Sequence, residues 1–277
     1  MSFFDGKTAV ITGAGGVLCS VFAKALAGEG CAVALLDLNK QAAQAVEAEI
    51  HAAGGKALAI ECNVLEKDSL LAAREEIHKR LGACDILLNG AGGNSPKCTT
   101  QKEYYEPGDL EGDVTSFFDL PREGFGFVFD LNLQGTLLPT QIFAADMLGR
   151  EDCCIINISS MNAFTPLTKI PAYSAAKAAV SNFTQWLAVH FAGVGIRVNA
   201  IAPGFFVTNQ NRALLFDQDG NPTPRSHKIL AATPMQRFGQ PEELTGTLLW
   251  LADGGKAGFV TGTVIPVDGG FSAYSGV

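Results

Sequence analysis

The chain has 277 residues, of which 47% are hydrophobic and 17% are charged, a balance that can fill a sizeable core and excludes a disordered or fibrous protein. Its formal net charge is −8, and because no block of five or six like charges occurs, the sequence predicts neither a nucleic-acid-binding nor a membrane-binding surface. An anionic small substrate stays possible, since salt screens distant charges beyond about 8 Å.

The N-terminal segment MSFFDGKTAV lacks a basic region followed by an apolar stretch, and the sequence contains no run of 18 apolar residues. We therefore expect no signal peptide, no membrane span and a cytoplasmic location.

Short apolar runs bounded by Gly, Asp or Asn alternate with segments of helical period along the whole chain. The runs are typical of strands buried on both faces, and most of the helical segments end at Gly. The predicted strands cover residues 8–12, 32–37, 57–64, 85–89, 154–159, 196–203 and 263–270. The predicted helices cover residues 20–30, 40–55, 67–82, 123–149, 173–195 and 241–253. This alternation predicts the α/β class, a Rossmann-like doubly wound parallel sheet with helices on both faces, as a single domain over residues 1–277.

The first strand runs into a glycine loop, TGAGGVLCS, at residues 12–20. Glycines at a strand-to-helix turn let a pyrophosphate approach the free N–H groups of the helix. Val17 and Cys19 occupy positions where such loops usually have glycine, so a glycine turn without a ligand explains this stretch equally well when it is taken alone.

Asp37 ends the second strand, at the place where a carboxylate accepts hydrogen bonds from the adenosine ribose and repels a 2′-phosphate. A strand-end cap is the alternative reading. We favour the ribose role, and hence NAD(H) over NADP(H), although Lys40 one turn later could tolerate a phosphate.

Two stretches lack any period, residues 93–122 and residues 204–235. Loops of this length are usually functional or disordered. Both follow apolar strands, at the carboxyl edge where open α/β sheets bind ligands, so we expect substrate loops rather than neutral insertions.

The seven cysteines are odd in number and include no Cys-x-x-Cys pair, and His51, His78, His190 and His227 show no ligand spacing. The sequence therefore predicts neither a disulfide framework nor a metal site, and we expect reduced, mostly buried thiols.

Tyr173 and Lys177 are four residues apart, so on a helix they share one face. A tyrosine that exchanges a proton with an alcohol near neutral pH needs its pKa lowered from about 10 by about 2 to 3 units, which is about 3 to 4 kcal/mol. One ammonium about 4 Å away supplies about 4 kcal/mol at an effective dielectric constant of 20. An ordinary surface pair would explain Tyr173 and Lys177 alone, but Ser160 at a strand end 13 residues earlier favours a catalytic group.

The chain resembles the short-chain dehydrogenase/reductase family over essentially its whole length. The resemblance rests on TGAGG at 12–16, NGAG at 89–92 in place of Asn-Asn-Ala-Gly, Asn132, Ser160, YSAAK at 173–177, and NAIAPG at 199–204 followed by Thr208. The chain departs from the family pattern at Val17, at Cys19, and at Asn63 where many members carry Asp. The resemblance implies an NAD(P)-dependent enzyme acting on CH–OH groups.

The resemblance also implies roles for individual residues. Tyr173 would be the general acid or base, Ser160 would bind the reacting oxygen, Lys177 would lower the pKa of Tyr173 and hold the nicotinamide ribose, and Asn132 would anchor a water of a proton relay. The implied cofactor-binding residues are Thr12, Gly13, Gly15, Gly16, Val17, Leu18, Asp37, Asn63, Val64, Asn89, Ala91, Gly92, Tyr173, Lys177, Pro203, Gly204, Phe206 and Thr208.

Within the family the chain is similar to the D-mannonate oxidoreductase (fructuronate reductase) subgroup, on the segments 157–191, 205–215 and 268–277 and on the long 93–122 insertion. A sugar acid needs a cation for its carboxylate and amides for its hydroxyls. The candidate substrate-binding residues are Asn94, Lys97, Asn162, Lys169, Asn211 and Arg212. We expect Lys169 or Arg212 to face the carboxylate.

Wide apolar faces on the segments 123–149 and 173–192, together with the family resemblance, imply a homotetramer or a homodimer. Two alternatives to a sugar-acid dehydrogenase remain open at this point. One is a reductase of another polyol, ketone or 3-oxoacyl substrate. The other is a cofactor-sensing binding protein without turnover, which the altered glycine loop suggests.

Overall fold

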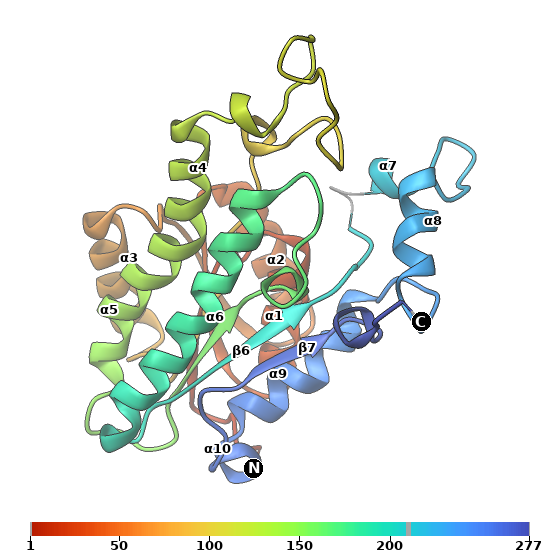
Figure 1. Cartoon of the computed structure of the whole chain (residues 1–277). Coiled ribbons are helices and arrows are strands. Elements are labelled where there is room, and N and C mark those ends of the chain that lie inside the picture. Colours follow the sequence, from red (N-terminus) through yellow and green to blue (C-terminus); the bar gives the residue numbers. More distant parts are fainter. Residues whose placement is uncertain (1, 209–211, 277) are drawn as a thin grey trace.

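The computed structural model describes residues 2–208 and 212–276, and its centre is a parallel seven-stranded sheet (Figure 1). The strands are β1 (Thr8–Thr12), β2 (Ala32–Asp37), β3 (Lys56–Glu61), β4 (Ile86–Asn89), β5 (Cys154–Ile158), β6 (Arg197–Pro203) and β7 (Val264–Val267). They are ordered β3-β2-β1-β4-β5-β6-β7, and every neighbouring pair is parallel. The strand order reverses between β1 and β4, where such sheets open a ligand crevice. The predicted fold class is confirmed.

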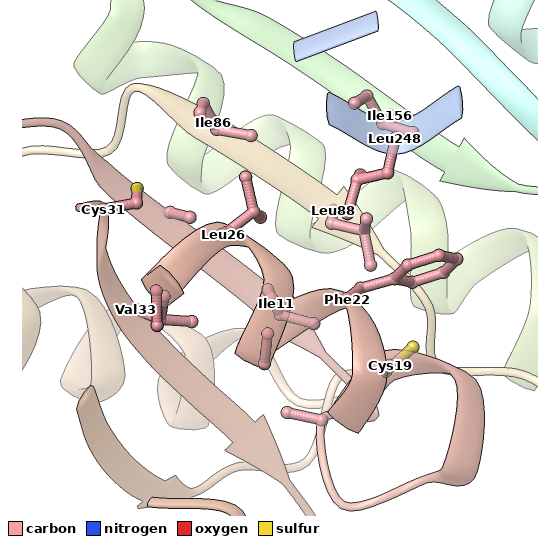
Figure 2. Close-up of a cluster of buried hydrophobic side chains, with 14 of the residues drawn as sticks. Ile11, Cys19, Phe22, Leu26, Cys31, Val33, Ile86, Leu88, Ile156 and Leu248 are labelled. Carbon is pink, nitrogen blue, oxygen red and sulfur yellow. The ribbon is translucent and has the colours of Figure 1, made fainter. Parts of the chain in front are cut away.

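Alternate side chains of each central strand enter two separate cores, because successive residues of a strand point to opposite faces. One core contains Ile11, Val33, Leu88 and Ile156 from the strands. Three helices cover this face: α1 (Val17–Gly28), α2 (Lys40–Ala52) and α9 (Thr245–Ala252). Figure 2 shows Phe22 and Leu26 of α1 meeting strand side chains and Leu248 of α9 in this core.

The opposite face carries the other set of strand side chains, among them Val10, Leu36, Leu87 and Ile155. The helices on this face are α3 (Lys67–Arg80), α5 (Gly135–Met147) and α6 (Pro171–Phe191). Each contributes a buried apolar stripe, so both faces of the sheet are closed to water.

The segment that we expected as one helix over 123–149 is interrupted. Helix α4 (Arg122–Phe129) passes through one π-helical turn, Asp130–Gln134, before α5 begins. Single π-turns of this kind are frequent at functional sites. Here the turn places Asn132, which is fully buried, against the loop that follows β4.

The two aperiodic stretches project beyond the carboxyl edge of the sheet (Figure 1). Residues 93–121 contain only two short 3-10 turns, Pro96–Cys98 and Phe117–Asp119. The second stretch differs from the prediction of a plain loop, because it contains α7 (Arg212–Leu215) and α8 (Pro224–Ala231). Thr223 caps α8 by accepting a hydrogen bond from the Ser226 N–H, and Ile229 packs with Leu215 and Phe238.

After these helices come a 3-10 turn, Pro241–Leu244, the short helix α10 (Gly254–Ala257) and a final turn, Phe271–Ala273. The seven cysteines are unpaired and buried, as expected. Over the described ranges, no helix is long and apolar enough to cross a bilayer and no three metal-ligating side chains converge.

Candidate active site

A cavity of about 540 Å³ opens at the carboxyl ends of β1, β2 and β4. It joins the glycine loop, the end of β2, the loop after β4 and the first turns of α6. The predicted cofactor residues that line it are Gly13, Gly15, Gly16, Val17, Leu18, Asp37, Ala91, Gly92, Tyr173, Lys177 and Thr208.

Two glycines of the loop allow close approach of the backbone. Gly13 has a φ of +66°, and a Cβ there would lie 2.9 Å from the Ala91 Cα atom. A Cβ on Gly15 would lie 2.6 Å from the Ala42 Cβ atom. Helix α1 begins directly after Gly16, which offers no side-chain cap, so the first N–H groups of the helix face the cavity mouth. Val17 is thus the first helical residue, and it lines the cavity.

Cys19 and Gly90 are the two departures from the family pattern that lie in contact. A Cβ on Gly90 would be 2.2 Å from the Cys19 Sγ atom and 2.9 Å from the Thr12 carbonyl oxygen. The thiol therefore fills the volume that the missing side chain of Gly90 leaves. Burial raises the pKa of the Cys19 thiol to about 12, so the group remains protonated and apolar.

Asp37 closes the cavity at the end of β2. One carboxylate oxygen accepts the Gly15 N–H at 2.9 Å and the other accepts the Asn39 N–H at 2.8 Å. Each oxygen keeps a further lone pair, which ribose hydroxyls could use. Lys40, the first residue of α2, makes no ion pair with Asp37 within the described residues.

Other predicted cofactor residues do not line the cavity but bond to the segments that form it or lie near it. Thr12 is buried, and its hydroxyl accepts the N–H groups of Gly90 and Ala91 at 3.1 and 3.2 Å. The Asn63 side chain bonds Glu66 and the Leu65 N–H. Asn63 and Val64 are not among the residues that line the cavity.

Pro203, Gly204 and Phe206, which lie at or just after the end of β6, also do not line the cavity. Pro203 ends β6, and a Cβ on Gly204 would meet the Asp268 Cα atom at 2.6 Å, so Gly204 serves close packing of the chain. Phe206 lines a different cavity, of about 460 Å³, together with Gly239.

Asn89 points into the core. Its amide donates to Thr140 Oγ1 and to Asn157 Oδ1, both at 2.9 Å, and the Asn157 amide in turn donates to Thr184 Oγ1 at 2.9 Å. This buried chain ties β4 and β5 to helices α5 and α6 beneath the cavity. The Asn89 Oδ1 atom is buried and has no hydrogen-bond partner among the residues that the structure describes. The sequence predicted Asn89 as a cofactor-binding residue from the NGAG motif, but its hydrogen bonds to Thr140 and Asn157 were missed, because the motif does not specify these partners.

Two of the four predicted catalytic residues, Tyr173 and Lys177, line the cavity, and the other two, Asn132 and Ser160, lie close to them without lining it. A Cβ on Gly92 would lie 2.7 Å from Asn132 Oδ1 and 3.1 Å from Lys177 Nζ, so both side chains converge on Gly92. The Lys177 ammonium donates to the Ile158 carbonyl oxygen at 2.7 Å and lies 5.8 Å from the centre of the Tyr173 ring.

The two titratable groups of this cluster are both perturbed by burial. Burial lowers the pKa of Lys177 to about 8. Burial also raises the pKa of Tyr173, and a hydrogen bond with Ser160 opposes that rise. We expected Lys177 to lower the pKa of Tyr173, whereas here the group that opposes the rise is Ser160.

Asn132 holds the loop after β4 in place. Its amide nitrogen donates to the carbonyl oxygens of Gly93 and Val128 at 2.8 and 2.7 Å, and its Oδ1 atom accepts the Gly93 N–H at 3.2 Å. Three of the four hydrogen bonds that an asparagine side chain can make are therefore used locally.

Another cavity, of about 360 Å³, lies beside the start of α6, and we call it the second cavity. Lys169, one of the predicted substrate residues, is among the side chains that line it. The other candidates lie elsewhere. Asn162 is buried, and its N–H donates to Ser160 Oγ. Within the described part of the chain, its Oδ1 atom has no hydrogen-bond partner. The Arg212 guanidinium lies 5.5 Å from the Phe216 ring centre.

Two further candidates, Asn94 and Lys97, are exposed, and Asn211 lies outside the described residues. Sequence reasoning missed Glu103, Arg225 and Lys228, which line the second cavity together with Lys169. The spacing of Arg225 and Lys228 was an available signal once α8 is recognised as a helix.

Comparison with known proteins gives one consistent result. A family model described as enoyl-(acyl carrier protein) reductase matches residues 16–272. A solved Haemophilus influenzae structure with bound NAD, provisionally assigned as a D-mannonate oxidoreductase, is 62% identical, with a TM-score of 0.95 over 99% of this chain and 97% of that one.

Two curated relatives extend the comparison. An uncharacterised oxidoreductase, UxuB, from Bacillus subtilis is 57% identical, covering 98% of this chain and 97% of the relative. The 7alpha-hydroxysteroid dehydrogenase of Escherichia coli K12 is 32% identical, covering 96% of this chain and 94% of the relative.

Proposed function

The chain belongs to the short-chain dehydrogenase/reductase family and is an NAD-dependent oxidoreductase, and on that basis we propose that it oxidises a sugar acid, D-mannonate, to D-fructuronate. The observation that carries this proposal is the position of Lys169. This cation lies four residues before Tyr173 in the sequence and lines the second cavity. A cation on the segment that leads into the Tyr173 helix suits a substrate that has a carboxylate and secondary alcohols. The provisional assignment of the Haemophilus relative supports the same substrate.

The first cavity fits NAD. The free N–H groups at the start of α1 would receive the pyrophosphate, and Gly13 and Gly15 keep that approach open. Asp37 would accept the adenosine ribose hydroxyls, and Lys177 would bind the nicotinamide ribose. When bound, NAD supplies the acceptor for the hydride that leaves the substrate carbon.

Tyr173 would take the hydroxyl proton of the substrate, and Ser160 would hold the oxygen from which that proton leaves. Because burial raises the pKa of Tyr173, oxidation should speed up with rising pH as the phenol ionises. Lys177, with a pKa of about 8, loses its charge at a lower pH than that at which Tyr173 ionises, so its ammonium would favour the phenolate only below about pH 8. The rise in rate above that pH would therefore follow the ionisation of the Tyr173 phenol alone.

Asn132 would position the other groups. It fixes Gly93, and Gly92 separates it from Lys177. Its one unused hydrogen-bonding site could anchor a water next to the Lys177 ammonium, which would carry the proton to solvent.

The test is NADH formation at 340 nm when the purified protein receives D-mannonate, with NAD and NADP compared side by side. Rapid turnover that prefers NAD is the expected result. D-mannitol, in which a neutral CH2OH replaces the carboxylate, is the matched control and should react far more slowly. Turnover of another alcohol with none of D-mannonate would reject the substrate but keep the mechanism.

Apolar side chains favour a second candidate substrate class. Phe205, Ile229 and Phe271 line the second cavity beside the cations. Such a wall suits a bulkier alcohol, and one relative is a hydroxysteroid dehydrogenase. A 7α-hydroxy steroid in the same assay would show this activity directly.

We also propose that the enzyme is a homotetramer. Trp186 and Val189 on α6 are 57% and 80% exposed, and Leu148 beyond α5 is 54% exposed. These exposed apolar residues of the α5 and α6 segments fit pairing with a second copy of the chain. Light scattering coupled to gel filtration measures the mass; a monomer would reject this assignment.

A further inference from the structure

The second cavity is lined by charged side chains from three segments that are far apart in the sequence. Glu103 comes from the insert after β4, Lys169 from the loop before α6, and Arg225 and Lys228 from α8. Three cations and one carboxylate thus face one space, in a protein whose net charge is −8.

Each cation is fixed in position by the local backbone. Arg225 and Lys228 are three residues apart on α8, so they share one face of that helix. Lys169 has a φ of +71°, a backbone conformation that residues other than Gly rarely adopt. The Thr100 N–H holds it there by donating to the Lys169 carbonyl oxygen at 2.9 Å. Strain of this kind at a cavity wall often marks a functional residue.

Glu103 lies among these cations. Lys228 Nζ donates to both of its carboxylate oxygens, at 2.9 and 3.0 Å. A hydrogen bond from Lys228, with smaller contributions from the charges of Lys169 and Arg225, lowers the pKa of Glu103 despite partial burial. Lys169 and Arg225 make no ion pair of their own with any described residue.

We propose that Lys169, Arg225 and Lys228 form the subsite that binds the carboxylate of the substrate, and that Glu103 is the internal carboxylate that the substrate displaces. One carboxylate leaves two of the three cations uncompensated, so the subsite can accept a monoanion. The apolar wall beside the cations, with Phe205 and Phe271, would contact the carbon chain. This inference rests on the proposed function, because it assigns the recognition of the sugar acid.

Binding without turnover tests the subsite. Calorimetric titration of sodium D-mannonate into protein saturated with NADH measures the Kd in a combination that cannot transfer a hydride. Arg225→Met should weaken the Kd for D-mannonate about tenfold or more, since hydrogen bonds to charged groups are worth that much. Glu103→Gln should tighten it about two- to fivefold, because an exposed competing ion pair is lost.

The controls separate charge recognition from folding. Lys79→Met removes an exposed cation on α3, far from the cavity in the fold, and should leave the Kd unchanged. The affinity for NADH should be the same in all variants. An Arg225→Met protein with the wild-type Kd, or a Glu103→Gln protein that binds D-mannonate more weakly, would overturn the proposal.

The two proposals fail in different ways. If D-mannonate binds with the predicted charge dependence but yields no NADH in the turnover assay, the sugar-acid oxidation fails and the subsite stands. If D-mannonate is oxidised and Arg225→Met leaves KM unchanged, the subsite fails and the proposed function stands.

Discussion

The cavity that fits NAD, here the cofactor cavity, and the second cavity, which Lys169 lines, are held by different kinds of structure. The wall of the cofactor cavity follows directly from strand ends, a glycine turn and a helix start, and buried side chains such as Thr12 and Asn132 support it. The wall of the second cavity comes from an irregular insert and a helix, α8, that contact each other through the Glu103–Lys228 ion pair. The comparison teaches that the predicted catalytic site is held by the core of the sheet, while the proposed substrate subsite is held by local polar contacts between segments outside that core.

The largest expected effect is at the catalytic end of the cofactor cavity. Tyr173→Phe removes the hydroxyl that exchanges the proton and should lower kcat by about 10²- to 10⁴-fold. Tyr173 is half-buried and its ring packs near Val128 and Ala176, so the phenylalanine ring should preserve the fold. NAD affinity, measured by fluorescence titration, should change little. Full activity in this variant would reject the catalytic assignment.

The next effect concerns the two departures from the family pattern. Gly90→Ala would place a Cβ 2.2 Å from the Cys19 Sγ atom. We expect a loss of about 1 to 3 kcal/mol in the free energy of unfolding, because overpacking forces neighbours to move. Cys19→Ala removes the sulfur, so the double variant should recover part of this loss.

Chemical unfolding of the wild type, both single variants and the double variant measures that coupling. We expect a favourable interaction energy of about 1 kcal/mol, typical of residues in contact. Strict additivity would mean that the thiol and the glycine are not a matched pair, and Cys19 would then be a tolerated oddity of the loop.

A third effect concerns cofactor choice, where a single side chain should decide. Asp37→Ser removes the carboxylate that would repel a 2′-phosphate and accept ribose hydroxyls. The ratio of kcat/KM for NAD over NADP should fall by about tenfold or more. Lys40→Met is the matched control on the same turn, and it should leave the ratio unchanged or raise it slightly. An unchanged ratio in Asp37→Ser would assign cofactor choice to other residues.

The difference between the two regions also explains what the sequence could predict. The alternation of strands and helices, the glycine loop and the grouping of Ser160 with Tyr173 and Lys177 follow from patterns that are short in sequence or fixed by strand ends. The pairing of Glu103 with Lys228 joins residues 125 positions apart. No local pattern encodes that contact, because each side chain alone looks like a solvated loop or helix residue.

Asn89 shows the same limit inside the core. Its place at the end of β4 was predicted, but its side chain bonds Thr140 and Asn157 instead of lining the cofactor cavity. The direction of a side chain at a strand end depends on partners from α5 and β5, which a motif does not specify. Likewise, the helix α8 was missed because Pro, Gly and Asn before it read as a turn and its eight residues give little period.

The smallest effect on global stability should come from the insert itself. Lys102 binds Glu106 and Asp109 within the same loop, and the Gln101 and Thr115 backbones bond across it at 2.9 Å. These contacts are local and mostly exposed, so Lys102→Met should shift the unfolding temperature by no more than about 2 °C. Limited proteolysis should nevertheless cut the insert faster, because its ion pairs order the loop rather than the core. Lys256→Met, which removes the exposed ammonium partner of the buried Asp253 at the opposite end of the molecule, is the control and should leave the cleavage rate of the insert unchanged. An insert that resists protease equally in both variants would mean that its contact with the Lys169 loop, through the Thr100 N–H, is enough to hold it.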